Sequence, residues 1–227
     1  DIQVLNYFKL KSKKPANLKP WKKITKTILQ NKKQVNIAII GKYVDLKDAY
    51  KSLDEALVHG GIKNNVKIKI IRIESDKLKI SEIKKKLIDA SGILIPGGFG
   101  KRGTEGKIAC INYARKNNIP FLGICFGMQM AVIEFARNVL KIKKAGSSEL
   151  DKKCFSVVGL IEEWSKNGKI VKGTSTKLGG TMRLGLYTAK LQHNSQIKDI
   201  YKSKIIHERH RHRYLSLIHI SEPTRPS

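Results

Sequence analysis

The chain has 227 residues, of which 41% are hydrophobic, and its 46 lysine and arginine residues against 18 aspartate and glutamate residues give a net charge of +28. This length accommodates one α/β domain with a sizeable core and excludes two full-sized domains. No run of about 18 apolar residues is present, which excludes a membrane-spanning helix. Because the N-terminal sequence lacks the features of a signal peptide and the 3 cysteines do not form a disulfide framework, we expect a cytoplasmic protein.

The positive charge admits two interpretations. A surface this basic would attract nucleic acid through its phosphates, which would make the chain a basic α/β nucleic-acid-binding module without catalysis. However, only 9 of the 46 basic residues are arginine, the side chain best suited to reading bases and gripping phosphates. The lysines are spread along the whole sequence and no aromatic stripe interleaves them. We therefore favour a solvated lysine-rich surface and expect neither membrane nor specific nucleic-acid binding.

Alternating strand and helix patterns begin at residue 35, after a lysine-rich segment, 1–34, that we interpret as an interdomain linker with short helical pieces around 4–8 and 21–29. Apolar, often β-branched runs predict strands at 35–41, 66–73, 92–96 and 119–124. Helical spacing of apolar residues predicts helices at 48–59, 81–90, 106–117 and 126–139. Gly60-Gly61 is expected to end the first of these helices, and Ser81 to cap the second.

Strands that alternate with helices across short connections predict an α/β fold, a doubly wound and mostly parallel sheet flanked by helices. Ligands of such sheets bind outside the carboxyl ends of the strands. Two glycine-rich turns, at 96–103 and 123–127, fall at that edge. Beyond residue 141 the chain is richer in strands and loops, with strands expected at 155–160, 169–173 and 179–185.

The first candidate site residue is Cys125, which stands in Gly123-Ile-Cys-Phe-Gly127 between a predicted strand and a predicted helix. The two glycines permit the tight strand–turn–helix geometry of a nucleophile elbow. The helix N-terminus is expected to lower the pKa of the thiol, and backbone N–H groups after the cysteine can face an oxyanion. Cys110 and Cys154 lack this setting and are interpreted as small core residues. A redox-sensing or small-molecule-binding α/β protein that uses Cys125 is an alternative.

The second candidate feature is the glycine-rich turn at 96–103. It contains Gly98-x-Gly100-x-x-Gly103 after a strand, which formally matches a dinucleotide-binding fingerprint. That fingerprint normally follows the first strand and has an acidic residue about 20 positions on, where this sequence has the Cys125 turn. We favour the alternative that Gly97-Gly98 supplies backbone N–H groups opposite Cys125.

Five motifs, in this order along the chain, resemble the triad-type, class I glutamine amidotransferases. They are Gly41-Lys-Tyr-Val-Asp-Leu-Lys-Asp-Ala-Tyr-Lys-Ser52, Pro96-Gly-Gly-Phe-Gly100, Gly123-Ile-Cys-Phe-Gly-Met-Gln129, Gly179-Gly-Thr-Met-Arg-Leu-Gly185 and Glu208-Arg-His-Arg-His-Arg-Tyr214. The likeness covers residues 2–214 and is most specific to members whose C-terminal amidotransferase domain serves an amidoligase domain. It implies the flavodoxin-like fold of this family over residues 35–214.

The resemblance implies that Cys125 attacks the side-chain amide of glutamine, forming a glutamyl thioester and releasing ammonia. Backbone N–H groups of Gly98 and Phe126 would hold the oxyanion. The residues implied in glutamine binding come from both glycine-rich turns and from two later positions: Gly98, Phe126, Gly127, Met128, Gln129, Glu149 and Arg213. Arg213 suits a carboxylate because a guanidinium group binds it in a bidentate manner.

The resemblance also implies partners outside this chain. The ammonia would pass to an amidoligase domain that converts UTP to CTP with ATP and Mg²⁺, and the intact protein would be a homo-oligomer. GTP would act as an activator, with Arg102, Glu105 and Arg183 as weaker candidates for its site.

A histidine-rich stretch precedes Tyr214. His207, His210 and His212 have the composition of a metal cluster, but the arginines that alternate with them, Arg209, Arg211 and Arg213, would repel a cation. We expect no metal in this chain.

After Tyr214 the sequence departs from the family pattern, in which Tyr-Glu-Val-Asn is followed later by Gln-Phe-His-Pro-Glu. That histidine is the general base of the family, and that glutamate orients it. We interpret residues 215–227 as a non-native tail and 35–214 as an amidotransferase domain that is incomplete at its C-terminus. His219 and Glu222 lack the spacing of the family's pair. This fragment alone is therefore expected to be inactive.

Overall fold

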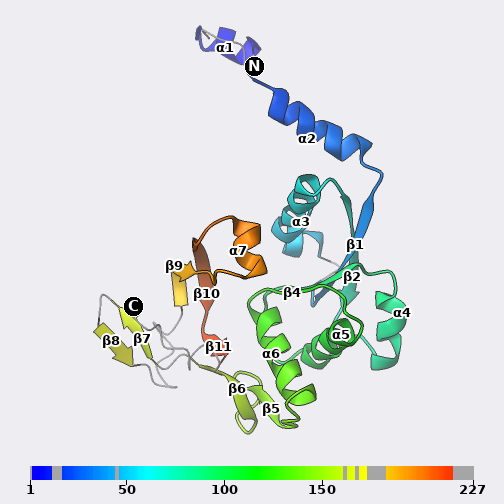
Figure 1. Ribbon diagram of the computed structural model, residues 1–227, viewed down its shortest axis with the longest axis vertical. Helices are drawn as coiled ribbons and strands as arrows, with labels where there is room; N and C mark the ends of the chain where they lie inside the picture. The colour runs from blue at the N-terminus through cyan, green and yellow to red at the C-terminus, as the bar shows by residue number, and fades with distance from the viewer. Residues whose placement is uncertain are drawn as a thin grey trace.

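The computed structural model describes residues 2–11, 17–43, 46–160, 163–166, 169–172 and 183–216. Its centre is a parallel sheet of four strands in the order β2-β1-β3-β4 (Figure 1). The strands are β1 Gln34–Gly41, β2 Lys67–Glu74, β3 Gly92–Ile95 and β4 Phe121–Gly123. This is the doubly wound α/β sheet predicted from the sequence, because strand order turns back across β1 between β2 and β3.

Helices cover both faces of this sheet. They are α3 Lys51–Lys63, which follows a short 3-10 turn η1 at Lys47–Tyr50, then α4 Ile83–Leu87, which follows η2 at Ile80–Glu82, α5 Thr104–Lys116 and α6 Phe126–Asn138. Right-handed crossovers place α3 on one face and α5 on the other. Figure 1 shows α3 on one side of the sheet, with α5 and α6 side by side on the opposite side.

Two predicted helix boundaries are wrong. Helix α3 continues through Gly60 and Gly61 to Lys63. Gly61 instead permits close contact with β2, because a Cβ atom there would lie 2.7 Å from the carbonyl oxygen of Val66. Ser81 is not a cap either, since it lies inside η2 and helix α4 begins after Glu82 without a side-chain capping bond.

The second half of the chain forms smaller sheets. One is a three-stranded sheet in the order β11-β6-β5, formed by β5 Ala145–Ser147, β6 Phe155–Leu160 and β11 Tyr214–Ser216. In the second, β7 Glu163–Lys166 pairs with β8 Lys169–Lys172. In the third, β9 Arg183–Lys190 pairs with β10 Ile205–His212. A short helix α7, Gln196–Tyr201, connects β9 to β10. The predicted strand at 155–160 is confirmed. Of the strand predicted at 179–185, residues 183–185 belong to β9 and the rest lie outside the described residues.

The proposed linker lies outside this body, whereas the described part of the proposed tail, residues 215 and 216, lies within it. Helices α1 Ile2–Tyr7 and α2 Lys19–Gln30 extend away from the sheet (Figure 1), and the described side chains of α2 include none that is buried. Residues 215 and 216 of the segment interpreted as a tail complete β11, where the hydroxyl of Ser216 is buried without a hydrogen-bond partner. Among the described residues, no helix is both long and apolar enough to cross a membrane.

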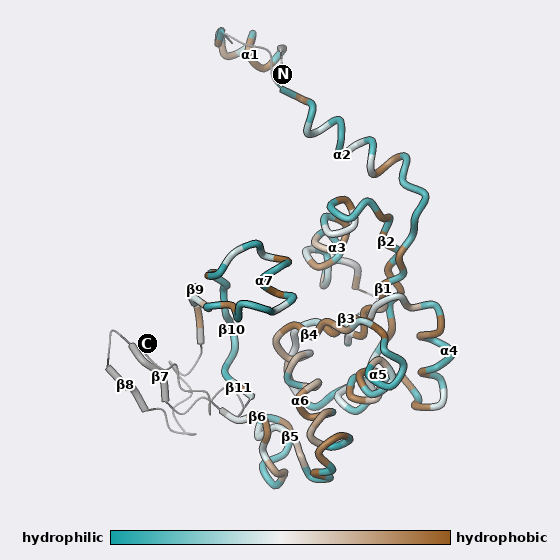
Figure 2. Tube along the Cα trace, in the orientation of Figure 1, coloured by the Kyte–Doolittle hydropathy of each residue, from teal (hydrophilic) through white to brown (hydrophobic). Residues whose placement is uncertain are grey.

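The hydrophobic core lies between the parallel sheet and helices α5 and α6. Figure 2 shows apolar residues concentrated along the sheet and these helices, whereas α2 is mainly hydrophilic. Ile40 and Ile95 from the strands contact Met130 and Ile133 from α6 within one cluster of buried side chains. Burial of a side chain of this size contributes about 1.5–3 kcal/mol, so this layer fixes the first turn of α6 against the sheet.

A buried carboxylate joins α5 to α6. Glu134 is 1% exposed and accepts hydrogen bonds from Asn112 (2.7 Å), Arg115 (2.8 and 3.0 Å) and Asn138 (3.1 Å). Burial raises the pKa of Glu134. The hydrogen bonds, chiefly those from Arg115 and Asn112, and the charge of Arg115 lower it by more than burial raises it, so the net pKa is below its usual value. The carboxylate is therefore ionised at neutral pH and holds donors from both helices.

Replacing Glu134 with alanine should reduce the free energy of unfolding by about 3 kcal/mol, because it leaves Arg115 and Asn112 without their shared acceptor. Urea denaturation at pH 7 measures this difference. Glu82→Ala is the matched control, since Glu82 pairs with Lys86 on the surface at 3.4 Å and such a pair contributes about 0.5 kcal/mol or less. Equal losses in the two variants would contradict the role assigned to Glu134.

Candidate functional site

Three loops meet at the carboxyl edge of the parallel sheet. Lys42 follows β1 directly, the glycine-rich turn at 96–103 follows β3, and Cys125 follows β4. Because β1, β3 and β4 are neighbours in the sheet, these three segments converge. This edge, beside the point where strand order reverses, is where open α/β sheets bind ligands.

Cys125 has the backbone conformation of a nucleophile elbow. Its φ of 53° and ψ of −102° place a non-glycine residue in a strained region, at a cost of about 1–3 kcal/mol. The flanking glycines make this turn possible: a Cβ atom on Gly123 would lie 2.5 Å from the backbone nitrogen of Met128, and one on Gly127 would overlap the carbonyl oxygen of Ile95. The predicted strand–turn–helix geometry is thus present.

Backbone hydrogen bonds fix the elbow on both sides. The N–H of Ile124 donates to the carbonyl of Ile95 (2.9 Å), which ties the turn to β3, and the N–H of Gly127 donates to Ile124 (2.9 Å). The N–H of Gln129 donates to the carbonyl of Cys125 (3.1 Å) and begins α6. The half-buried thiol therefore projects from a turn that the sheet and the helix both hold.

The thiol of Cys125 differs from the expectation in its acidity. Burial raises its pKa, the hydrogen bond from the N–H of Phe126 lowers it, and the negative charge of Glu149 raises it again. The helix N-terminus thus lowers the pKa through the N–H of Phe126, as predicted, but burial and Glu149 outweigh it, and the net pKa is above the usual value for cysteine. The thiol also lies 4.0 Å from the carbonyl oxygen of Arg211.

Two backbone segments lie near Cys125. Phe126 directs its N–H at Cys125. After β3, Gly97 borders Cys125, because a Cβ atom on Gly97 would be 3.7 Å from the Cβ atom of the cysteine. Gly98 comes next and has open space where a side chain would be. The roles of Gly98 and Phe126 as oxyanion donors stay predictions.

Three of the predicted glutamine-binding residues, Gln129, Glu149 and Arg213, interact with Tyr214. Gln129 is 4% exposed and donates from Nε2 to the carbonyl oxygen of Tyr214 (2.9 Å). Glu149 accepts a hydrogen bond from the N–H of Gly100 (2.8 Å), and its charge acts on the phenol of Tyr214, as does the charge of Arg213. Burial and Glu149 raise the pKa of that phenol, whereas Arg213 lowers it. An acidic and a basic side chain therefore flank one site. Met128 is half-buried in the first turn of α6.

Two lysines close to Phe126 were not identified as site residues from the sequence. The ammonium group of Lys42 is 5.9 Å from the centre of the Phe126 ring, and that of Lys107 is 5.3 Å from it. Lys42 also donates to the carbonyl oxygens of Phe99 and Gly100. Lys42 lies in a quoted motif directly after a strand, and Lys107 lies on the apolar face of α5 beside Ile108 and Ile111. These two positions in the sequence could have identified Lys42 and Lys107 as candidate site residues.

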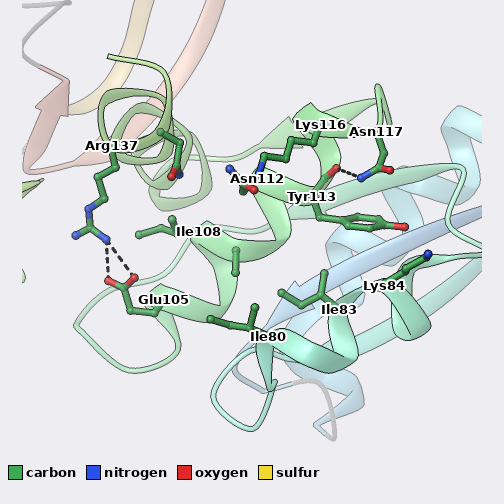
Figure 3. Close-up of a pocket in the computed structure, with 12 residues that line it drawn as sticks. Ile80, Ile83, Lys84, Glu105, Ile108, Asn112, Tyr113, Lys116, Asn117 and Arg137 are labelled. Carbon is green, nitrogen blue, oxygen red and sulfur yellow. Dashed lines mark hydrogen bonds and ion pairs between the residues drawn. The ribbon is translucent and has the colours of Figure 1, made fainter. Parts of the chain in front are cut away.

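Of the three candidate residues for GTP, Arg102 and Glu105 have different partners. Arg102 pairs with Asp76 (2.9 Å) and lies over the ring of Tyr43. Glu105 instead pairs with Arg137 (3.0 Å) at the rim of a separate groove of about 440 Å³ over α4, α5 and α6 (Figure 3). The side chain of Arg183 lies outside the described residues.

The histidines of β10 divide between its two faces, because alternate residues of a strand point in opposite directions. Nδ1 of His207 is 3.0 Å from the hydroxyl of Thr188 on β9. His210 and His212 share the other face, with Nδ1 of the first 2.9 Å from Nε2 of the second, and Nδ1 of His212 donates to the carbonyl of Tyr214 (3.1 Å). In the part of the chain that the structure describes, no group of three or more His, Cys, Asp or Glu side chains is placed to hold a metal ion. His219 and Glu222 lie outside that part.

The other cysteines are in different environments. Cys110 is fully buried in α5, and burial raises the pKa of its thiol to about 12. Burial and the charge of Asp151 raise the pKa of Cys154, whose side chain contacts Gly146. Neither stands in an elbow, as the sequence predicts.

This fold and this site define a class of protein. The family described as "Glutamine amidotransferase class-I" matches residues 45–219, so the chain belongs to that family. Its relatives narrow the assignment to CTP synthases. The chain is 75% identical over 214 residues to the CTP synthase of Pelagibacter ubique (strain HTCC1062) and 48% identical over 226 residues to that of Zymomonas mobilis subsp. mobilis (strain ATCC 31821 / ZM4 / CP4).

The sequence alignments and the structural superposition cover different shares of the matched proteins. The two alignments cover 94% and 98% of this chain but 40% and 42% of the relatives, so the chain spans about 40% of the length of these curated proteins. Among solved structures, the glutaminase domain of Trypanosoma brucei CTPS with bound acivicin superposes with a TM-score of 0.68 and 37% identity over 80% of this chain and 68% of that one. The observed architecture is thus the fold of a CTP synthase glutaminase domain.

Lys107 gives a stability prediction for this site. It is 2% exposed, and burial, followed by repulsion from Lys42, lowers its pKa from 10.5 to about 8. Its charged form is disfavoured in the folded state, so Lys107 costs stability at neutral pH, and this cost disappears as the pH rises from 8 to 10.5.

Lys107→Met should therefore raise the free energy of unfolding at pH 7 by about 3 kcal/mol, and the gain should shrink progressively above pH 8. Urea denaturation of both proteins from pH 7 to pH 10 measures the difference. Lys116→Met, which removes an exposed lysine from the same helix, should change stability by about 0.5 kcal/mol or less at every pH. A destabilised Lys107→Met variant at pH 7 would contradict this account.

Proposed function

We propose that this chain is the glutaminase part of a CTP synthase, in which Cys125 hydrolyses glutamine and the ammonia serves the ATP-dependent conversion of UTP to CTP. The observation that carries the proposal is the elbow at Cys125, whose thiol faces Phe126 on one side and Gly97 on the other. Membership of the class I family and the likeness to CTP synthases support the same substrate.

In the proposed reaction the sulfur of Cys125 attacks the side-chain carbonyl carbon of glutamine. An S–C bond forms, and the negative charge on the carbonyl oxygen is stabilised by the N–H groups of Gly98 and Phe126. The C–N bond then breaks, and the nitrogen leaves as ammonia with the proton taken from the thiol. Water next attacks the thioester, the S–C bond breaks, and glutamate departs while the thiol is restored.

Three side chains bind the substrate in this proposal. Glu149 and Arg213 carry opposite charges that both act on Tyr214, which suits the α-amino and α-carboxylate groups of glutamine. Gln129 lies in the first turn of the helix that begins after Cys125 and contacts the backbone of Tyr214.

The remaining partners follow from the family and stay predictions. ATP, Mg²⁺ and UTP belong to an amidoligase domain outside these 227 residues, the intact protein is a homo-oligomer, and GTP is its activator. Arg102 and Glu105 would have to exchange their present partners, Asp76 and Arg137, to share one nucleotide.

Acivicin, the molecule bound to the trypanosomal glutaminase domain, should modify this chain at Cys125 in preference to Cys110 and Cys154. Only Cys125 combines an accessible sulfur with neighbouring oxyanion donors and a glutamine-binding pair. Peptide mapping by mass spectrometry after incomplete reaction identifies the modified residue. Excess glutamine should protect Cys125, and Cys125→Ala should remain unmodified. Equal modification of all three cysteines in the folded chain would contradict the proposal.

The 227-residue chain should nevertheless show negligible glutamine turnover. Among the described residues, the Cys125 sulfur contacts the N–H of Phe126 and the carbonyl of Arg211, and neither group is a base. Release of ammonia needs a proton donor and hydrolysis of the thioester needs an activated water. Loss of such a base costs about 4–8 kcal/mol of transition-state stabilisation.

Ammonia release measured by a coupled assay tests this. A continuation of the family type, ending in Gln-Phe-His-Pro-Glu and joined after Tyr214, should restore turnover, and Cys125→Ala in that longer chain should abolish it. Turnover by the present chain at a comparable rate, lost on His219→Ala, would show that the tail itself supplies the base.

A further inference from the structure

Lys42 and Lys107 occupy an unusual position for lysines, next to each other at the base of the proposed glutamine site. Repulsion from Lys42 contributes to the lowered pKa of Lys107, and both ammonium groups lie within 6 Å of the same ring, that of Phe126. Phe126 is 1% exposed and directly follows Cys125. Two like charges held this close are costly, so the arrangement calls for a compensating role.

Lys42 holds one of the two oxyanion segments. Its ammonium group donates to the carbonyl oxygens of Phe99 and Gly100, on one side of the loop. Glu149 accepts the N–H of Gly100 on the other side, at 2.8 Å. Directly after Gly98, the backbone is therefore fixed both through its carbonyl groups, by Lys42, and through an N–H group, by Glu149. Since Gly98 and Gly100 are glycines with open space around them, this grip substitutes for the side-chain packing that normally fixes a loop.

Lys107 holds the other segment. It rises from the first turn of α5 beneath Phe126, and none of the hydrogen bonds among the described residues involves its ammonium group. The interaction that the structure does give it is with the Phe126 ring at 5.3 Å. A cation over an aromatic face is attracted by the electrons of the ring, and more strongly when the pair is desolvated. Its remaining charged neighbours are Asp76 and Glu74, which attract it, and Lys42 and Arg102, which repel it.

We propose that Lys42 and Lys107 are positioning residues of the glutaminase site, which together hold the N–H groups of Gly98 and Phe126 toward the carbonyl under attack. The inference rests on the proposed function and adds residues that act through the backbone rather than on the substrate. The charges that act on the Cys125 thiol include Glu149 but neither lysine. Their removal should therefore affect the stabilisation of the oxyanion and leave the acidity of the thiol as it is.

Two probes separate these effects in the 227-residue chain. In acivicin, a chlorinated isoxazoline, attack of the sulfur on the ring carbon places negative charge on the ring nitrogen before the C–Cl bond breaks and chloride leaves. That step uses the oxyanion donors. Iodoacetamide alkylates the sulfur by direct displacement: the thiolate attacks its CH2 carbon, an S–C bond forms and iodide leaves, which needs no oxyanion donor. The rate constant for modification of Cys125 is measured with each reagent by mass spectrometry.

For Lys42→Met and Lys107→Met we expect acivicin modification to slow by about tenfold or more, because removal of a donor outright costs about 10²–10³, while iodoacetamide modification changes by less than about twofold. Lys42→Arg keeps the charge and the donors and should recover part of the acivicin rate. Lys116→Met is the control and should match the parent chain with both reagents. Lys107→Met is expected to be the more stable protein, so a slower reaction in that variant cannot be attributed to unfolding.

The outcomes distinguish the two proposals. If the parent chain is not modified by acivicin at Cys125, the proposed glutaminase function fails. If the parent chain reacts and both methionine variants react equally fast, the function stands and the positioning role is overturned. Equal slowing with acivicin and iodoacetamide would also overturn it, because the lysines would then act on the thiol itself.

Discussion

The contact between the first turn of α6 and the end of β3 is the constraint on which the site depends. Gly127 lies so close to the carbonyl oxygen of Ile95 that no side chain fits, and the N–H of Ile124 donates to that same oxygen. The chain between them must turn within one residue, which forces Cys125 to a positive φ. The same contact directs the N–H of Phe126 at the sulfur and buries Gln129. Nucleophile, oxyanion donor and one substrate contact therefore follow from a single backbone approach.

This geometry separates positioning from activation. The helix terminus supplies one N–H group to the sulfur, yet burial and Glu149 leave the pKa of the thiol above its usual value. A thiol in this state is well placed but mostly protonated at neutral pH. The elbow accordingly stabilises charge that develops on the substrate, whereas formation of the thiolate requires a base, and the groups that the structure shows in contact with the sulfur are the N–H of Phe126 and the carbonyl of Arg211. The family pattern assigns that task to a separate histidine.

Local patterns predicted what depends on local geometry. The parallel strands, the order of the helices and the elbow all follow from short apolar runs and from glycines at fixed spacing, and the structure confirms them. The end of α3 was wrong because Gly61 serves contact with Val66, a neighbour that helix-stop signals do not consider. The sequence likewise predicted the lowering effect of the helix N-terminus on the pKa of Cys125, but not the burial and the charge of Glu149, which raise the net pKa above its usual value.

The lysines also show that a sequence pattern does not reveal which side chains the fold buries. With 46 basic residues along the chain, composition alone predicts that the lysines lie on a solvated surface. This prediction is correct for exposed lysines such as Lys116. Lys107 has the same side chain nine residues earlier on the same helix, but a position on its inner face places it against Phe126. A charge buried there costs free energy that a methionine would not. Its presence at the base of the site is therefore better explained by what it holds in place than by its contribution to the stability of the fold.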